Sequence, residues 1–261
     1  MVAKNLKLLI NYRELLLNLV IREIKVRYKQ SVLGVAWAVF QPLLLMIIFT
    51  IVFSFFARMP SDGIPYPLFS YSALLPWIFF SGAINRSTHS LVNNRNLITK
   101  VYFPREILPI ASIVTALIDF AIASIIFIGL LVLYKISLSL YIFLLFPIII
   151  IQIFLVLGLS LFFSSFNVFF RDIGQAVPLV LQIWMYLSPI VYPISLVPEK
   201  VRFLYILNPM VGIIDSCRKI IIQGIAPDFA YLSISVVVTF VIFYFSHKFF
   251  KKLEMSFADI I

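Results

Sequence analysis

Side chains that could carry out acid–base chemistry are sparse in the apolar parts of this chain. Asp119 is the only charged residue well inside a long apolar stretch. An ionised carboxylate at the centre of a membrane costs roughly 2.5–3.5 kcal/mol, so this side chain should face the interior of a helix bundle or a cavity. It could belong to a proton relay or be a hydrogen-bonded structural acid. We expect the structural role, with Gln152 or a serine as partner, because proton-driven transporters usually carry several such acids.

No combination of residues predicts an active site or a metal site. Cys217 is the single cysteine, which excludes an internal disulfide and a multi-cysteine metal site. His89 and His247 lie far apart in sequence and lack metal-ligand spacing. None of the eight glycines is followed by lysine, so the phosphate loop G-x-x-x-x-G-K-[ST] is absent. We therefore expect no catalytic residue, metal or cofactor in this chain.

Aromatic side chains are the other residues with a chemical use, and they make up 16% of the chain. Most suit a lipid-facing surface or the belts at the membrane–water interfaces. Some fall where a pore could be lined, and aromatic faces stack on the apolar faces of sugar rings. These candidates for a substrate path are Trp37, Phe40, Trp184, Tyr186 and Tyr192.

The composition indicates a membrane protein. Hydrophobic residues make up 62% of the 261 residues and charged residues 12%, and the mean hydropathy is +1.08. Soluble domains are typically about 45–50% apolar and about 25% charged. We predict one all-α polytopic domain over residues 1–261, with no room for a soluble catalytic domain.

Six apolar stretches are long enough to be transmembrane helices. They cover roughly residues 35–56, 66–85, 107–133, 140–164, 173–193 and 229–247. The second and fifth stretches contain prolines, which remove a backbone donor, so we expect kinks or broken ends there.

The positive charges predict the orientation of these spans. Fifteen of the 21 Lys and Arg residues lie in the amino-terminal segment, the 86–106 loop, the 165–172 loop and the carboxyl-terminal tail. Positively charged loops stay in the cytoplasm, so both termini are predicted to be cytoplasmic. The net charge of +10 then reflects topology and anionic lipid heads rather than nucleic acid.

The segment 4–30 is predicted to be an amphipathic helix in the plane of the membrane interface. Polar residues from Lys4 to Lys29 recur every three or four positions and fall within about an 80° arc, with apolar residues opposite. From Arg22 onward the helix is polar nearly all round, which suits a protein neighbour better than lipid.

The outer segment 194–228 is too long for a simple loop and is predicted to form two short helices. Pro198 can begin the first, Asn208–Pro209 can cap and begin the second, and Gly224 can end it. Apolar helices on the outer side should dip into the membrane or plug an opening. An amphipathic surface flap fits the composition equally well.

Three sequence blocks resemble bacterial ATP-binding-cassette polysaccharide export permeases, the membrane subunits that export O-antigen, capsule or teichoic acid chains. The first runs from Arg22 to Gly34 (REIKVRYKQSVLG), followed by Trp37 and Gln41–Pro42. The second is NLITKVYFPRE at 96–106, followed by Leu108–Pro109. The third comprises FFRDI at 169–173, SPIVYP at 188–193 and Asn208–Pro209. The blocks occur in the order seen in that family.

The resemblance implies a homodimer around a central channel, with two separate ATPase subunits that bind ATP and Mg²⁺. It implies a coupling helix at about 94–102, a channel lined by the first and fifth spans, and a gate formed by the outer helices. The implied contacts with the ATPase are Arg22, Glu23, Lys25, Arg27, Asn96 and Lys100, and the implied gate residues are Phe203, Asn208 and Pro209.

The resemblance also implies a lipid-linked polysaccharide as substrate and the bacterial cytoplasmic (inner) membrane as location. Arg27 or Arg171 could meet the pyrophosphate of the lipid carrier, but lipid-head contact or pairing with Glu23 or Asp172 is the favoured alternative. Other classes remain open: an exporter of teichoic acid, a small lipid or a drug, a membrane-embedded glycan-modifying enzyme, or a structural or sensor protein. No motif separates one glycan from another.

Overall fold

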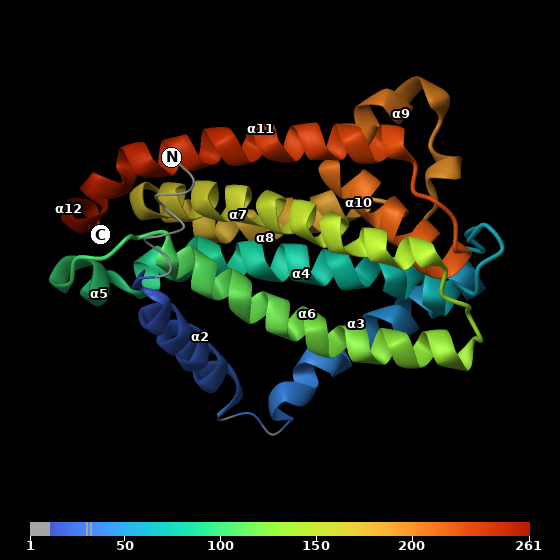
Figure 1. Cartoon of the computed structure of the whole chain (residues 1–261), viewed down its shortest axis with the longest axis horizontal. Coiled ribbons are helices and arrows are strands. Elements are labelled where there is room, and N and C mark those ends of the chain that lie inside the picture. The colour runs from blue at the N-terminus through green and yellow to red at the C-terminus, as the bar shows by residue number, and fades with distance from the viewer. Residues whose placement is uncertain (1–10, 30, 32) are drawn as a thin grey trace.

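The structure is a computed structural model that describes residues 11–29, 31 and 33–261. All regular elements in these residues are helices, and the long ones run side by side as a bundle (Figure 1). This confirms the predicted all-α class. Residues 4–10 and Gln30 of the predicted interface helix lie outside the described residues.

The α-helices are α2 (Arg13–Tyr28), α3 (Trp37–Phe49), α4 (Tyr66–Asn93), α5 (Arg95–Lys100), α6 (Ile107–Leu133), α7 (Leu145–Phe169), α8 (Asp172–Tyr186), α9 (Glu199–Ile206), α10 (Pro209–Arg218), α11 (Phe229–Leu253) and α12 (Phe257–Ile260). Two π-helical segments, Thr50–Phe56 and Lys219–Gln223, extend α3 and α10. Short 3₁₀ segments span Gly34–Ala36, Leu140–Leu144, Ile194–Leu196 and Glu254–Ser256.

Five helical segments of the described chain are long and apolar enough to cross a membrane. They are Gly34–Phe56, Tyr66–Asn93, Ile107–Leu133, Leu140–Phe169 and Phe229–Ile260. The predicted count of six is not confirmed, because the predicted span 173–193 corresponds to α8, which has only 15 residues. Such a helix is about 22 Å long, less than a hydrocarbon core of about 30 Å. It ends before the Ser188–Pro189 turn, as the prolines of this stretch led us to expect.

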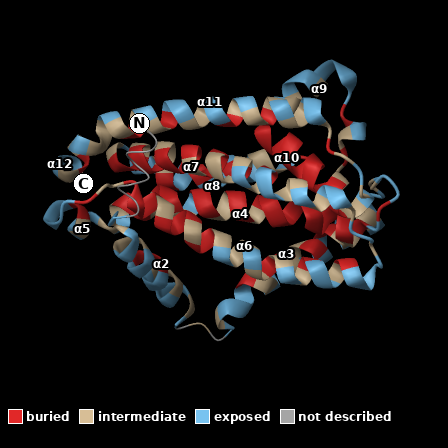
Figure 2. Ribbon diagram, in the orientation of Figure 1, coloured by how far each residue is buried: buried red, intermediate tan, exposed pale blue. Residues whose placement is uncertain are grey.

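The second span is longer than predicted and continues past residue 85 to Asn93. The assignment of Arg86 to a loop was therefore wrong. Helix α4 lies at the centre of the bundle and packs against α3, α6, α7, α8 and α10, and most of it is buried (Figure 2). Neighbouring helices bind its polar residues: Ser87 donates to the hydroxyl of Ser160 at 2.6 Å, and Asn167 donates to the Thr88 carbonyl at 3.0 Å.

One end of the bundle gathers α5, α12 and the beginning of α2, whereas α9 lies at the opposite end (Figure 1). A compact apolar cluster joins the elements of the first end, and we call it the end cluster. Its buried members include Val20 of α2, Ile98 of α5, Phe250 of α11 and Phe257 of α12. Helix α5 is short, and the side chain of Ile98, 1% exposed, places it in this cluster.

The two predicted outer helices are α9 and α10. As predicted, Asn208 caps α10 by accepting from the Met210 amide, Pro209 is its first residue, and Gly224 ends the following turn with φ of +67°. All ten residues of α10 are buried, whereas no residue of α9 is. The two predicted alternatives thus apply to different helices: α10 enters the bundle and α9 covers its surface.

The burial of α10 depends on Gly212. A Cβ atom there would lie 2.6 Å from the Tyr231 carbonyl oxygen of α11, whereas a Cβ at Gly129 would meet no atom within 4 Å. We expect Gly212→Ala to cost about 1–3 kcal/mol through overpacking and to lower the melting temperature of the detergent-solubilised protein by about 5 °C. Gly129→Ala is the matched control. Equal melting temperatures for both variants would contradict this close packing.

Candidate functional site

A polar cavity of about 960 Å³ lies among α2, α3, α4 and α6. Its location is unusual because α3, α4 and α6 belong to segments apolar enough to cross a membrane. Its polar and charged lining consists of Arg22, Glu23, Arg27, Gln41, Ser81, Asn85, Arg86, His89, Ser90, Asn93, Asn94, Ser112, Thr115 and Asp119.

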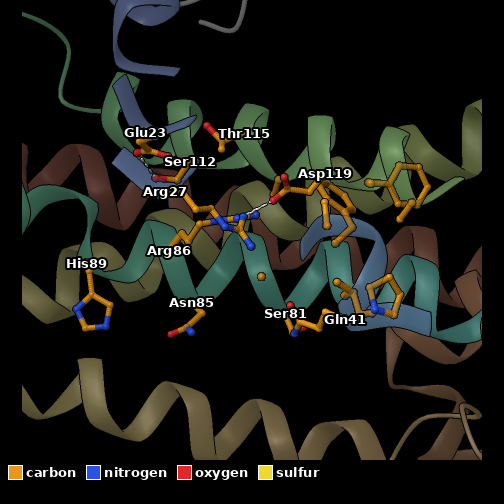
Figure 3. A pocket seen from close by; sticks show the side chains of 18 of the residues that line it. Glu23, Arg27, Gln41, Ser81, Asn85, Arg86, His89, Ser112, Thr115 and Asp119 are labelled. Atoms are coloured by element: carbon orange, nitrogen blue, oxygen red, sulfur yellow. Dashed lines mark hydrogen bonds and ion pairs between the residues drawn. The ribbon is translucent and has the colours of Figure 1, made fainter. Parts of the chain in front are cut away.

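Asp119, near the middle of α6, is the centre of this cavity's electrostatics. Arg27 of α2 and Arg86 of α4 both form ion pairs with its Oδ2 atom, the latter at 2.8 Å (Figure 3). The Tyr28 hydroxyl donates to the other carboxylate oxygen at 2.7 Å. The carboxylate side chain is only 14% exposed. One acid therefore links three helices, and two arginines compensate its single charge.

Tyr28 can serve as a permanent donor in this group. Partial burial, together with the hydrogen bond to Asp119 and its charge, raises the pKa of Tyr28 to about 12. The phenol therefore keeps its proton at neutral pH. The negative charge of the group then remains on Asp119, where the two guanidinium ions stabilise it.

The predicted partners of Asp119 were wrong. Gln152 instead donates from Nε2 to the Pro76 carbonyl of α4 at 2.6 Å. The suggested pairing of Arg27 with Glu23 is also absent from the described contacts, because Glu23 accepts from the Ser112 hydroxyl of α6 at 2.8 Å. Both errors have one cause: α2 packs along α6 and brings its arginine to the acid. The structural role expected for Asp119 agrees with this geometry.

The six predicted ATPase contacts fall into two groups. Arg22, Glu23 and Arg27 line the cavity, and Arg22 donates to the Asn94 side chain at the end of α4. Lys25 of α2 and Asn96 and Lys100 of α5 are exposed. The first group holds α2 against the bundle, and because Arg22 and Arg27 are also exposed, both groups have side chains accessible to a partner.

The five aromatic residues predicted for a substrate path lie outside the polar cavity. Trp37 and Phe40 of α3 and Tyr186 of α8 are 45%, 47% and 51% exposed. Trp184 instead donates from Nε1 to Asn208 Oδ1 at 2.9 Å and meets the Phe80 ring edge-on. The structure thus separates three exposed rings from one that supports the outer helices.

The other predicted residues lie around the junction of α8, α9 and α10. The Tyr192 hydroxyl donates to the Tyr186 carbonyl at 2.8 Å. Asn208 donates to the Leu187 carbonyl at 2.8 Å, and Pro209 is buried. Phe203 of α9 is 67% exposed. Asn208 therefore ties the start of α10 to the end of α8.

Sequence reasoning missed the α4 wall of the cavity. Ser81, Asn85 and His89 recur at intervals of four and follow one face of the helix, with Arg86 beside them (Figure 3). This i, i+4, i+8 spacing is the signal that could have extended the helix beyond residue 85. The described residues contain no group of three or more His, Cys, Asp or Glu side chains that could hold a metal ion.

Comparison with known proteins agrees with this arrangement of apolar helices around a polar cavity. Residues 14–222 match the ABC-2 type transporter family, a range that runs from α2 to the turn after α10. The chain belongs to the ABC-2 type transporter family. As a member of this family, the chain is a multi-pass membrane permease and not itself an enzyme.

Individual relatives align with this ABC-2 chain over nearly its whole length. An O-antigen export system permease protein of Myxococcus xanthus is 33% identical over 255 residues, 96% of each chain. A protein of the same name from Klebsiella pneumoniae is 32% identical over 249 residues, 95% of each chain. A polysialic acid transport protein of Escherichia coli is 24% identical over 244 residues, 90% of this chain and 92% of that one.

We expect the interactions of Asp119 with Arg27 and Tyr28 to hold α2 against the helix bundle of this permease. Asp119→Asn removes the charge that compensates Arg27 and Arg86, and breaking a buried pair costs about 3–5 kcal/mol. The partial exposure of Arg27 places the loss near the lower limit. We expect a cysteine at Val20, 4% exposed in the native chain, to react with maleimide several-fold faster in Asp119→Asn.

This labelling is carried out in a Cys217→Ala background. The matched control is Asp62→Asn, which removes one charge from an exposed site where Ser195 donates to the carboxylate. Equal labelling of the Asp119→Asn and Asp62→Asn proteins would show that the ion pairs do not hold α2.

Proposed function

We propose that this chain is the membrane subunit of an ATP-driven exporter that moves a lipid-linked polysaccharide, such as O-antigen, out of the cytoplasm. The observation that carries the proposal is the whole-length similarity to two O-antigen export permeases, at 32–33% identity. The weaker similarity to a polysialic acid transport protein supports the same substrate class. The location is the bacterial inner membrane, with both termini in the cytoplasm.

Energy for export comes from two separate ATPase subunits that bind ATP and Mg²⁺. Their docking surface is the end of the bundle that carries α5, with Asn96 and Lys100 exposed there, and Lys25 is exposed further along α2, in its last turn. The end cluster supports this assignment, because Ile98 of α5 is buried there together with residues of α2, α11 and α12. A push on α5 therefore moves several helices together.

The channel forms between two copies of the chain, along α3 and α8. Both helices keep one side uncovered in the single chain, where Trp37, Phe40 and Tyr186 are exposed. Aromatic rings suit a moving glycan because each ring contacts the apolar face of a sugar without a deep binding site. Asn208 and Trp184 connect α8 to α10, so a tilt of α8 would shift the buried outer helix.

The polar cavity receives the charged end of the lipid carrier. Arg22, Arg27 and Arg86 supply three guanidinium groups there, and guanidinium matches phosphate oxygens with paired hydrogen bonds. Asp119 compensates these charges while the cavity is empty of substrate. An entering phosphate would compete with the carboxylate for Arg27 and so loosen α2 from α6.

The docking assignment can be tested without disturbing the end cluster. We expect Asn96→Ala combined with Lys100→Glu to abolish stimulation of the co-purified ATPase, because both side chains are exposed on α5 and Ile98 is retained. Stimulation is measured as ATP hydrolysis in proteoliposomes. Lys135→Glu, a charge reversal outside α5, is the control. Unchanged stimulation in the double variant would remove α5 from the docking surface.

The channel assignment can be tested with the exposed rings. We expect Phe40→Ala and Tyr186→Ala each to lower polysaccharide display at the cell surface at least several-fold, with normal amounts of protein in the membrane. Phe146→Ala, which removes a ring of α7 that is 73% exposed and lies on neither α3 nor α8, is the control. Normal display in both test variants would exclude these rings from the path.

Trp184→Phe separates the two roles of that residue. Phenylalanine keeps the contact with Phe80 but loses the indole donor to Asn208, so any loss of display then reports on the outer helices.

A further inference from the structure

A second, apolar groove of about 590 Å³ lies on the outside of the bundle where α7 and α11 pack. Leu159 and Phe162 of α7 form one wall, and Val241 and Phe245 of α11 form the other. Helix α11 lies at the edge of the bundle opposite α3, and much of its outer surface is exposed (Figure 2). The groove therefore lies on the opposite side of the bundle from α3, one of the two helices proposed to line the channel.

The two sides of α11 differ in what they contact. Lys251 faces the bundle, where its ammonium group lies 3.3 Å from Glu106 and 2.9 Å from Glu254. Lys248 and Lys252 lie on the groove side with Val241 and Phe245, at intervals of four, three and four residues. One helix thus presents a paired lysine to the protein and two other lysines to the groove.

Lys248 and Lys252 are exposed, and neither forms an ion pair within the described part of the chain. Like charges one helical turn apart repel each other, so the pair favours an anion between them. The lysines lie at the α12 end of α11, while the apolar walls extend into the span. The groove therefore has two lysines at one end and apolar walls along the rest of its length.

The floor of the groove consists of packed aromatic rings. The Phe249 ring stacks on Phe166 of α7, with centroids 5.1 Å apart and an interplanar angle of 16°, and also contacts Phe162 at 5.7 Å. These aromatic contacts join α7 to α11 beneath the groove.

We propose that this groove is a binding site for an anionic phospholipid. An acyl chain lies along Phe162, Val241 and Phe245, and the phosphate lies between the ammonium groups of Lys248 and Lys252. A phospholipid satisfies both halves of the groove, since it carries a long apolar chain and a negative charge in one molecule. A second copy of this chain would have to bring an acid to the two lysines.

Native mass spectrometry of the purified full chain in detergent tests this directly. Phosphatidylglycerol and phosphatidylcholine, with identical acyl chains, are titrated separately. We expect Lys248→Ala combined with Lys252→Ala to weaken phosphatidylglycerol binding about tenfold and to weaken phosphatidylcholine binding much less, because choline offsets the phosphate charge of that lipid. Lys135→Ala combined with Lys200→Ala removes the same net charge from two sites outside the groove and should leave both affinities unchanged.

A second variant tests the apolar half. Val241→Trp fills the groove and should weaken the binding of both lipids, while Lys248→Arg combined with Lys252→Arg should keep the preference for phosphatidylglycerol. The proposal fails if the Lys135/Lys200 control loses as much affinity as the Lys248/Lys252 variant. It also fails if Val241→Trp changes the oligomeric state but not lipid binding, because a second copy would then cover the groove.

Discussion

The ion pairs of Asp119 with Arg27 and Arg86 are the constraint on which the rest of this structure depends. A carboxylate within a membrane span is stable only when cations and donors replace the water it has lost. Here the cations come from α2 and α4, so the acid on α6 joins three elements distant in sequence. Asp119, Arg27 and Arg86 also keep a polar cavity beside the apolar helices, because charged side chains cannot pack into an apolar core.

Helix α4 makes this arrangement feasible. It is the most enclosed of the long helices, so neighbouring protein groups, rather than lipid, meet its polar residues. Serine and asparagine bonds to α7 hold one side, and the cavity-lining row with Arg86 occupies another. The helix therefore continues through a sequence that would end a lipid-facing span.

Helix α2 connects the cavity to the proposed ATPase end. Its Val20 lies in the end cluster with Ile98 of α5, and its Arg27 lies seven residues further on at Asp119. Arg22 adds a direct bond to Asn94, immediately before α5. In the proposed exporter, movement of α5 and loss of the ion pairs would thus be linked through one rigid helix. The groove between α7 and α11 lies apart from this path.

The sequence by itself determined the features that depend on neighbouring residues along the chain. The range 107–133 coincides with α6, and Asn208–Pro209 and Gly224 bound the second outer helix, because apolar length, capping and turn chemistry are local. The short helix within 94–102 was implied by the resemblance of its sequence block to a known family. Tertiary structure alone decided the partners of Asp119 and the burial of α10. Those features depend on which helices become neighbours. Hydropathy and spacing do not encode this, because an arginine that pairs with an acid on another helix and an arginine in a loop look the same in the sequence.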